Sequence, residues 1–158
     1  MSCLSAWSLW LIALVVASLE TAGAMAQCQP PPGTQWPPDN GCKPGTVSEM
    51  TLPSGTELDR YGLPTGSYFA PTRTPIPARA LACDPMAVHL PHSCYVTEKP
   101  ATFEACETAA WFGKPGGGTQ FRSQQNADAL KQAGLLRQVQ CRQALPVTGN
   151  ALPAARSR

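Results

Sequence analysis

The apolar positions of this chain form one long run and several short ones. The long run covers residues 4–19, is broken only by three serines, and leads to an Ala-x-Ala sequence just before Gln27. That pattern is typical of a secretory signal peptide, and the run is short for a membrane span, which needs about 20 apolar residues. We therefore expect residues 1–26 to be removed on export. A retained membrane anchor is the alternative, because no Lys or Arg precedes Lys43.

The short apolar runs predict strands. Residues 58–61 and 68–70 are partly aromatic and are separated by the turn-forming stretch 62–66, as in two strands joined by a tight loop. Residues 95–97 form another β-branched and aromatic run, and residues 135–139 resume a strand pattern.

Only one stretch has helical spacing. Apolar residues recur at this spacing from Ala127 to Ala133, and Gly134 follows at the place of a left-handed helix stop. Either Ser123 or Asn126 is suitable as the N-cap.

Prolines limit the rest of the chain. Five of them within residues 71–93 exclude a long helix there. The whole pattern predicts an α+β, mostly β fold, in which a small antiparallel sheet or sandwich core has one supporting helix and is stapled by disulfides.

The composition indicates how the chain is divided into segments. Residues 28–55 hold seven prolines and four glycines, which indicates an ordered loop or linker. We expect a Pro/Gly-rich segment at 27–51, one domain at 52–141 and a flexible tail at 142–158. Once Glu20 is removed with the signal, twelve basic and nine acidic residues leave a balance of +3. This is far from the dense basic surface of a nucleic-acid-binding protein.

Cysteine usage fits an exported chain. Six cysteines remain after residues 1–26 are removed, an even number that indicates up to three disulfides. Because Cys28 and Cys42 lie in one irregular segment, we expect them to pair. A zinc site built from His89, His92 and Cys94 is the alternative, and it is disfavoured because no Cys-x-x-Cys pair accompanies them.

The densest chemical signal is a glycine-rich block at residues 111–121, with three consecutive glycines followed by Thr119 and Gln120. Glycines lose the most backbone entropy on ordering, so a folded domain keeps them where the backbone needs positive φ or a close approach. The block is not a phosphate-binding P-loop, because no Lys-Ser or Lys-Thr follows the glycines. A flexible hairpin loop is the structural alternative.

A second signal combines arginine with aromatic residues. Arg60 lies in one predicted strand, Tyr68 in its partner, and Arg79 in a basic and apolar stretch that follows. Arginine binds pyrophosphate through a planar fork, and an aromatic face stacks on a nicotinamide or adenine ring. In the ordinary alternative, Arg60 pairs with Asp59 or Glu57 and Tyr68 fills the core.

Taken together, these stretches resemble the tuberculosis necrotizing toxin (TNT) domain family, which includes secreted and surface NAD glycohydrolases of fungi. The stretches that carry the resemblance are Leu-Pro-Ser-Gly-Thr-Glu-Leu-Asp-Arg-Tyr-Gly at 52–62, Gly-Ser-Tyr-Phe-Ala-Pro at 66–71, Ala-Arg-Ala-Leu at 78–81, Trp-Phe-Gly-Lys-Pro-Gly-Gly-Gly-Thr-Gln-Phe at 111–121 and Leu-Lys-Gln-Ala-Gly-Leu-Leu at 130–136. They occur in the family's order and cover roughly residues 50–140.

The resemblance implies hydrolysis of NAD⁺ at the nicotinamide–ribose bond, with NADP⁺ as a second candidate substrate. NAD⁺ would be the substrate, and no cofactor and no metal is expected. The signal peptide predicts a secreted protein without a membrane partner after cleavage, and the modest charge predicts no nucleic-acid partner. The expected catalytic residues are Gln120 and Arg60, and the expected substrate-binding residues are Tyr61, Tyr68, Arg79, Trp111, Gly116, Gly117 and Gly118.

The chain departs from the family pattern at a few positions. Ala82 and Cys83 stand where prolines are common, and we expect a disulfide at Cys83 to offset the lost stiffness. Lys114 replaces a common Gln. His89 and His92 are both candidates for the family's histidine.

Two other functions stay open at this point. An ADP-ribosyltransferase would use the same bond cleavage, although such enzymes usually have a catalytic Glu where this chain has Gln120. A non-catalytic, cysteine-rich secreted effector or binding module is the second alternative.

Overall fold

The computed structural model describes residues 28–141, so the predicted signal peptide and the predicted C-terminal tail lie outside the described residues. The strands are β1 (Ser48–Leu52), β2 (Glu57–Tyr61), β3 (Tyr68–Pro71), β4 (His92–Thr97), β5 (Ala101–Glu107), β6 (Thr119–Arg122) and β7 (Leu136–Val139). The helices are α1 (Ala127–Gln132) and the short 3₁₀ turns η1 (Asp39–Gly41) and η2 (Ile76–Arg79). Within residues 28–141 no helix has the length and apolar character needed to cross a membrane.

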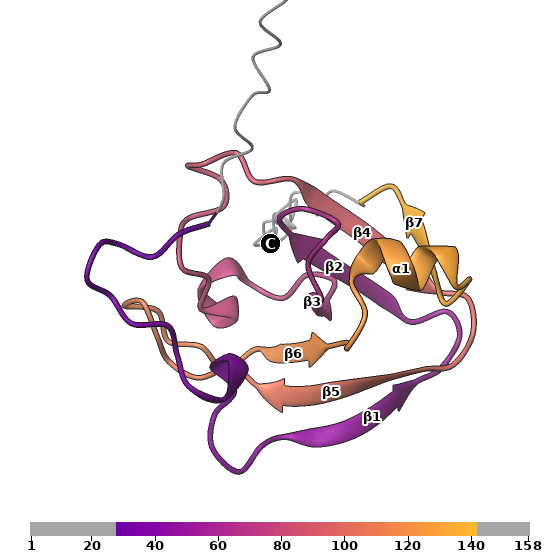
Figure 1. The fold of residues 1–158 in the computed structure, drawn as a ribbon, viewed down its shortest axis with the longest axis horizontal. Coiled ribbons are helices and arrows are strands. Elements are labelled where there is room, and N and C mark those ends of the chain that lie inside the picture. The colour runs from indigo at the N-terminus through magenta and orange to yellow at the C-terminus, as the bar shows by residue number, and fades with distance from the viewer. Residues whose placement is uncertain (1–27, 142–158) are drawn as a thin grey trace, which may run out of the picture.

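The seven strands form one antiparallel sheet in the order β1-β5-β6-β3-β2-β4-β7. Figure 1 shows the sheet curling, with β1, β5 and β6 stacked at the bottom and β2 and β4 running obliquely above them. The predicted fold class is therefore confirmed: residues 28–141 are mostly β, with one α-helix and three disulfides.

Strand alternation sends the large apolar side chains to one face of this sheet. Leu58 pairs across the strands with Tyr95, and Phe69 pairs with Phe121. The buried cluster consists of Leu52, Leu58, Phe69, Tyr95, Ala101, Phe103, Ala105, Phe121, Ala127, Leu130 and Leu136. The opposite face of β2, β3 and β6 is left for polar side chains.

Helix α1 begins and ends at the residues that the sequence signals predicted. Asn126 is the N-cap, and its side-chain oxygen accepts a hydrogen bond from the Ala129 amide at 2.8 Å. Gly134 takes the left-handed conformation with φ of 66° just past the helix. The helix buries Ala127 and Leu130 and lies against β7 (Figure 1).

The expected Cys28–Cys42 disulfide is wrong. Cys28 is bonded to Cys83, Cys42 to Cys106 and Cys94 to Cys141. The segment from residue 28 to 45 runs beside other loops of the domain, so each of its two cysteines bonds to a partner far away in the sequence.

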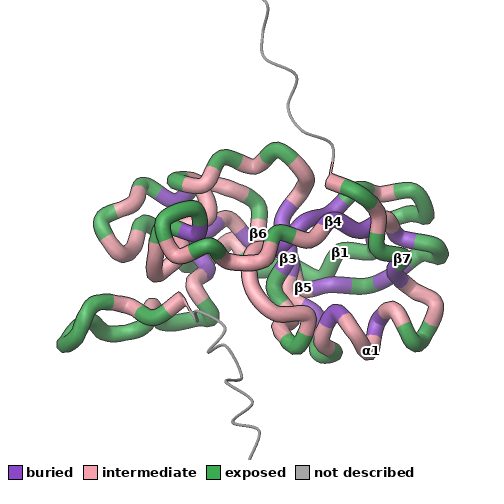
Figure 2. Tube along the Cα trace, turned by 90° about the horizontal axis from the view of Figure 1, so that it is seen from above, coloured by how far each residue is buried: buried purple, intermediate pink, exposed green. Residues whose placement is uncertain are grey.

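These loops form a second part of the molecule, beyond the end of the sheet. In Figure 1 the indigo N-terminal segment runs beside the orange loop between β5 and β6. The Trp111 indole Nε1 donates to the main-chain oxygen of Gln35 at 2.9 Å, and the Trp36 ring packs edge-on against Phe112 at 5.7 Å. Figure 2 shows this loop-rich part at one end of an elongated molecule, where the buried stretches are shorter than in the sheet.

Candidate functional site

Two neighbouring strands carry polar side chains on the face opposite the core. In β2, Asp59 and Tyr61 alternate with the fully buried Leu58. The antiparallel register places Asp59 opposite Cys94 and Tyr61 opposite His92 on β4. Directly paired residues project from the same face, so the predicted site residue Tyr61 has a histidine as its neighbour.

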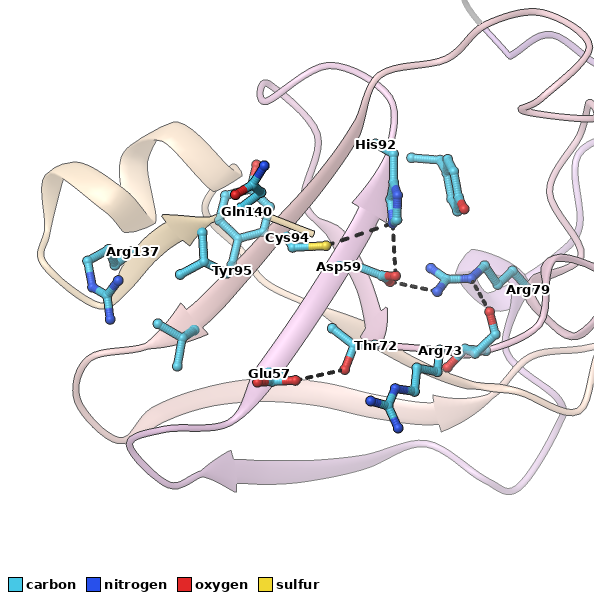
Figure 3. Close-up of a pocket in the computed structure, with 14 residues that line it drawn as sticks. Glu57, Asp59, Thr72, Arg73, Arg79, His92, Cys94, Tyr95, Arg137 and Gln140 are labelled. Carbon is cyan, nitrogen blue, oxygen red and sulfur yellow. Dashed lines mark hydrogen bonds and ion pairs between the residues drawn. The ribbon is translucent and has the colours of Figure 1, made fainter. Parts of the chain in front are cut away.

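Asp59 is the centre of a charged cluster on this face (Figure 3). Its Oδ1 lies 2.6 Å from Nη2 of Arg79, and its Oδ2 lies 3.0 Å from Nε2 of His92. The Arg79 contact lacks the direction of a hydrogen bond, so it is an ion pair. The Asp59 and Arg79 side chains are 5% and 7% exposed, and removing one charge of a buried pair leaves the other uncompensated.

The rings of this cluster are stacked. The His92 imidazole lies parallel to Tyr61 at 4.3 Å, and the Arg79 guanidinium carbon lies 5.3 Å from the centre of the same Tyr61 ring. Arg79 Nε also donates to the main-chain oxygen of Thr74 at 2.9 Å. Arg79 therefore has its position fixed from three sides.

Gln120 is on β6, and the register pairs it with Cys106 on β5. Its Nε2 donates to the main-chain oxygen of Asn40 at 3.1 Å and lies 3.8 Å from each sulfur of the Cys42–Cys106 disulfide. Because a carbonyl oxygen only accepts, the nitrogen end of the amide must face Asn40. Oε1 of Gln120 accepts no hydrogen bond from any of residues 28–141.

A cavity of about 320 Å³ brings together four of the nine predicted site residues. Tyr68, Arg79, Trp111 and Gln120 all line it, and they come from four different segments of the chain. The remaining lining residues are Trp36, Pro37, Asn40, Gly41, Ala80, Leu81, Ala82, Ala109 and Phe112. We take this cavity as the candidate site, because aromatic, cationic and amide groups converge on it.

A larger groove of about 610 Å³ lies next to it on the outer face of β2, β4 and β7. Figure 3 shows its lining, in which Arg73 and Arg137 accompany Glu57 and the Asp59 cluster. Arg79 lines both cavities. The groove contains Tyr61 and lacks Gln120, so it is a neighbour of the candidate site.

Arg60 points the other way. It follows Asp59 in the strand, and its guanidinium lies among core residues, with its central carbon 5.8 Å from the centre of the Phe69 ring. Its Nη1 donates to the main-chain oxygen of Tyr68 at 3.3 Å, and the side chain lies so close to Gly66 that a Cβ there would be 2.0 Å from Nη2. Burial lowers the pKa of the Arg60 guanidinium, and the charges of Tyr95 and Asp128 act against this shift. Arg60 also lines a small recess of about 40 Å³ together with Tyr68 and Gln120.

None of the three consecutive glycines lines either of these two cavities, and they pack instead against neighbouring main chain. A Cβ at Gly116 would lie 2.5 Å from the main-chain oxygens of Thr108 and Ala109. The Gly117 amide already donates to the Thr108 oxygen at 2.9 Å, and the Gly118 amide to the Ala78 oxygen at 3.0 Å. These two N–H groups therefore hold the glycine-rich block against Thr108, which follows β5, and against η2.

Two of the departures from the family pattern contact each other. The Lys114 ammonium donates to the main-chain oxygens of Leu81 and Cys83, the latter at 2.8 Å. Cys83 is held in turn by its disulfide to Cys28. Burial lowers the pKa of Lys114, and the nearby Asp84 carboxylate acts against this shift. Residues 81–83 are thus fixed by a lysine and a disulfide.

The two histidines differ in their surroundings. His92 belongs to the Asp59 cluster, whereas His89 is in an exposed turn with φ of 50° and lines neither cavity. His92, Cys94 and Cys141 have their side-chain donor atoms within 4.8 Å of one another. Cys94 and Cys141 are bonded to each other, however, so neither offers a thiolate to a metal.

Sequence reasoning missed one wall of the site. Trp36, Asn40 and Gly41 come from the segment that composition marks only as Pro/Gly-rich, and Asn40 contacts both Tyr68 and Gln120. The Asn40-Gly41 pair just before Cys42 could have indicated a tight turn at this place, because Asn and Gly tolerate the left-handed conformation. Asp59 was also missed as a partner of Arg79.

Comparisons with known proteins were made on sequence and on structure. The family described as Tuberculosis necrotizing toxin matches residues 51–139. The conidial surface nicotinamide adenine dinucleotide glycohydrolase nadA of Aspergillus fumigatus is 35% identical over 121 residues, covering 69% of this chain and 51% of nadA. The solved structure of tuberculosis necrotizing toxin complexed with its immunity factor IFT is 26% identical, with a TM-score of 0.55, and covers 65% of this chain and 60% of that one.

The chain thus spans about half the length of the curated relative that it matches. The family match covers more than half of the chain and includes β2, β3, η2, the glycine-rich block and α1. The structural likeness extends over a similar part of the chain. On this evidence the chain belongs to the tuberculosis necrotizing toxin family.

Proposed function

We propose that the protein is a secreted NAD⁺ glycohydrolase, which hydrolyses the nicotinamide–ribose bond to give ADP-ribose and nicotinamide. The observation that carries the proposal is the convergence of Tyr68, Arg79, Trp111 and Gln120 on one cavity of about 320 Å³. The relative nadA is named a nicotinamide adenine dinucleotide glycohydrolase, which supports the same chemistry here.

The residue types in the cavity suit this reaction. Nicotinamide leaves a cationic pyridinium as a neutral base, so no strong general acid is needed, and the ribose gains oxocarbenium character. The protein's task is then to orient the substrate and to favour the changing charge distribution. An amide and aromatic side chains meet that need without a titrating group.

Gln120 is the group that we assign to the reacting ribose. Its nitrogen is held by the Asn40 carbonyl, which leaves Oε1 as an acceptor for a ribose hydroxyl or for the attacking water. Tyr68 and Trp111 offer aromatic faces for a planar ring, and 43% of Tyr68 is exposed. In this proposal Arg79 supplies positive charge toward the phosphates, although the Asp59 ion pair neutralises part of it.

Arg60 has a supporting part in this proposal. Its hydrogen bond to the Tyr68 main chain and its place beside the small recess fix β3 under the site. We assign Tyr61 the same kind of part, because its ring stacks between His92 and Arg79.

We also propose that the protein acts outside the producing cell. Three disulfides are typical of oxidising compartments, and nadA is named a conidial surface protein. In this proposal the enzyme would deplete the NAD⁺ of the producing cell if it stayed in the cytosol. Export separates the enzyme from that NAD⁺.

The test uses the mature protein, purified with its disulfides intact. NAD⁺ and, in parallel, NADP⁺ are supplied, and the release of nicotinamide and ADP-ribose is followed by chromatography. Gln120→Ala should reduce kcat by about 100-fold or more, the usual cost of removing a positioned transition-state contact. Gln138→Ala, on the exposed face of β7, is the matched control and should keep wild-type turnover.

The same assay separates the alternatives. Release of free ADP-ribose supports hydrolysis, whereas transfer of labelled ADP-ribose to a protein acceptor would identify a transferase. No consumption of either dinucleotide would refute an enzymatic function and favour a binding module. Wild-type turnover in Gln120→Ala would refute the assignment of this residue alone.

A further inference from the structure

The η1 turn contacts two residues of the candidate site through a single residue. The main-chain oxygen of Asn40 accepts the Gln120 Nε2 hydrogen bond at 3.1 Å, and its side-chain Oδ1 accepts the Tyr68 hydroxyl at 3.4 Å. Asn40 precedes residues 51–139, the part of the chain that the family matches. The contact is therefore a feature of this chain's N-terminal segment.

The turn itself is tightly held. Asn40 has φ of 56° and ψ of 25°, a left-handed conformation that Asn tolerates better than most residues. The Cys42 amide donates to the Asp39 oxygen at 3.0 Å, and the Ala109 amide donates to the Gly41 oxygen at 2.8 Å. These bonds fix both ends of the turn.

A disulfide adds a covalent link to the same place. The register pairs Cys106 with Gln120, so their side chains project from the same face of the sheet. Cys42 is bonded to Cys106, and Asn40 precedes Cys42 by two residues. Strand pairing, disulfide and turn together bring the Asn40 carbonyl to the Gln120 amide.

We propose that Asn40 is a positioning residue of the site, which orients Gln120 with its main chain and Tyr68 with its side chain. The main-chain contact decides which end of the Gln120 amide faces the cavity, because the nitrogen has to face the carbonyl. The side-chain contact restrains a half-exposed tyrosine. The proposal rests on the proposed NAD⁺ glycohydrolase function for its kinetic test.

Two substitutions separate the two contacts. Asn40→Gly keeps the main-chain carbonyl, because glycine adopts positive φ without strain, and it removes only the acceptor for Tyr68. We expect kcat to be retained and KM for NAD⁺ to rise by about threefold, which corresponds to the loss of a weak neutral hydrogen bond.

Asn40→Val places a β-branched residue at φ of 56°, a conformation that such residues rarely adopt. The turn must therefore move, and the Gln120 contact is lost. We expect kcat to fall at least about tenfold, because Gln120 is no longer oriented.

The matched control is Asp39→Asn. This residue has φ of 51° in the same exposed turn and lines neither cavity, and Asn again tolerates that conformation. The control should keep wild-type kcat and KM. Circular dichroism and thermal unfolding of all three variants check that the fold is intact, which is expected because the altered side chains are exposed.

A second readout does not need activity. In ¹⁵N spectra of the ligand-free protein, the side-chain amide resonance of Gln120 should shift in Asn40→Val and stay in place in Asn40→Gly. An unmoved resonance in Asn40→Val, or equal loss of kcat in both variants, would overturn the positioning role. If the wild-type protein consumes no NAD⁺, the proposed function fails while this spectroscopic test of Asn40 still stands.

Discussion

The glycine-rich block offers a sharp test of the packing argument, because adjacent glycines differ in what surrounds them. Gly116 and Gly117 both have positive φ, of 64° and 84°. A Cβ on Gly116 would lie 2.5 Å from the main-chain oxygens of Thr108 and Ala109, whereas a Cβ on Gly117 would have nothing within 4 Å. Gly116→Ala and Gly117→Ala therefore share the backbone strain and differ in the clash.

The magnitudes follow from these two contributions. A residue with a Cβ in the left-handed conformation lowers the free energy of unfolding by about 1–2 kcal/mol. This strain is the whole loss that we expect for Gly117→Ala. Gly116→Ala adds the cost of forcing atoms into a filled space, about 1–3 kcal/mol. The Thr108 oxygen cannot simply retreat, because it accepts the Gly117 amide at 2.9 Å. Alanine also reduces the entropy of the unfolded chain, but equally in both variants, so the difference between them is unaffected.

The free energy of unfolding is measured in urea with the disulfides intact, and the midpoint temperature by calorimetry. Gly116→Ala should be less stable than Gly117→Ala by about 1–3 kcal/mol, which corresponds to roughly 4–12 °C in the midpoint for a domain of this size. Equal stability of the two variants would refute the idea that Gly116 is required by its close approach to the main chain of Thr108 and Ala109.

Two further variants test contacts around the site. Asp59→Ala should lower the free energy of unfolding by about 3–5 kcal/mol, because it leaves Arg79 buried without its carboxylate; a loss in urea unfolding below about 1 kcal/mol would contradict a structural role for this ion pair. Trp111→Phe keeps an aromatic face in the cavity and removes the 2.9 Å hydrogen bond to Gln35, so the segment before η1 should exchange its amide hydrogens faster. Unchanged hydrogen exchange there would show that this bond does not hold the segment.

Local sequence signals predicted part of the local structure, namely β2, β3, β4, β7 and α1. The strands around residues 58–61 and 68–70 were predictable because these partly aromatic runs are bounded by Gly and Pro. The helix was predictable because Asn126 caps it and Gly134 ends it. Strands β1, β5 and β6 were not predicted. Strand β1 is an edge strand with one buried residue, Leu52, and its pattern is mostly polar.

The candidate site was predictable only in part. Tyr68, Arg79, Trp111 and Gln120 were named from the family motifs, and the structure brings them to one cavity. Whether the other residues reach the site depends on the face of the strand that they occupy. Asp59 and Arg60 are adjacent in sequence but lie on opposite faces of β2. The N-terminal wall depends on long-range contacts such as Trp111 to Gln35, and no local pattern encodes these contacts.

The connectivity of the disulfides has a consequence for how the protein is made. Among the six cysteines of residues 28–141, no native bridge joins two that are consecutive in the sequence: each bridge skips at least one cysteine, and neighbouring bridges interlock. Oxidation in the order in which the chain emerges during translocation would pair Cys28 with Cys42 first, and that product is non-native. A chain oxidised in that order reaches the native pairing only by thiol–disulfide exchange after Cys141 has emerged, a process that takes seconds to hours and depends on the oxidant and on an isomerase. The yield of native protein from a secreting host should thus be governed by that host's isomerase supply.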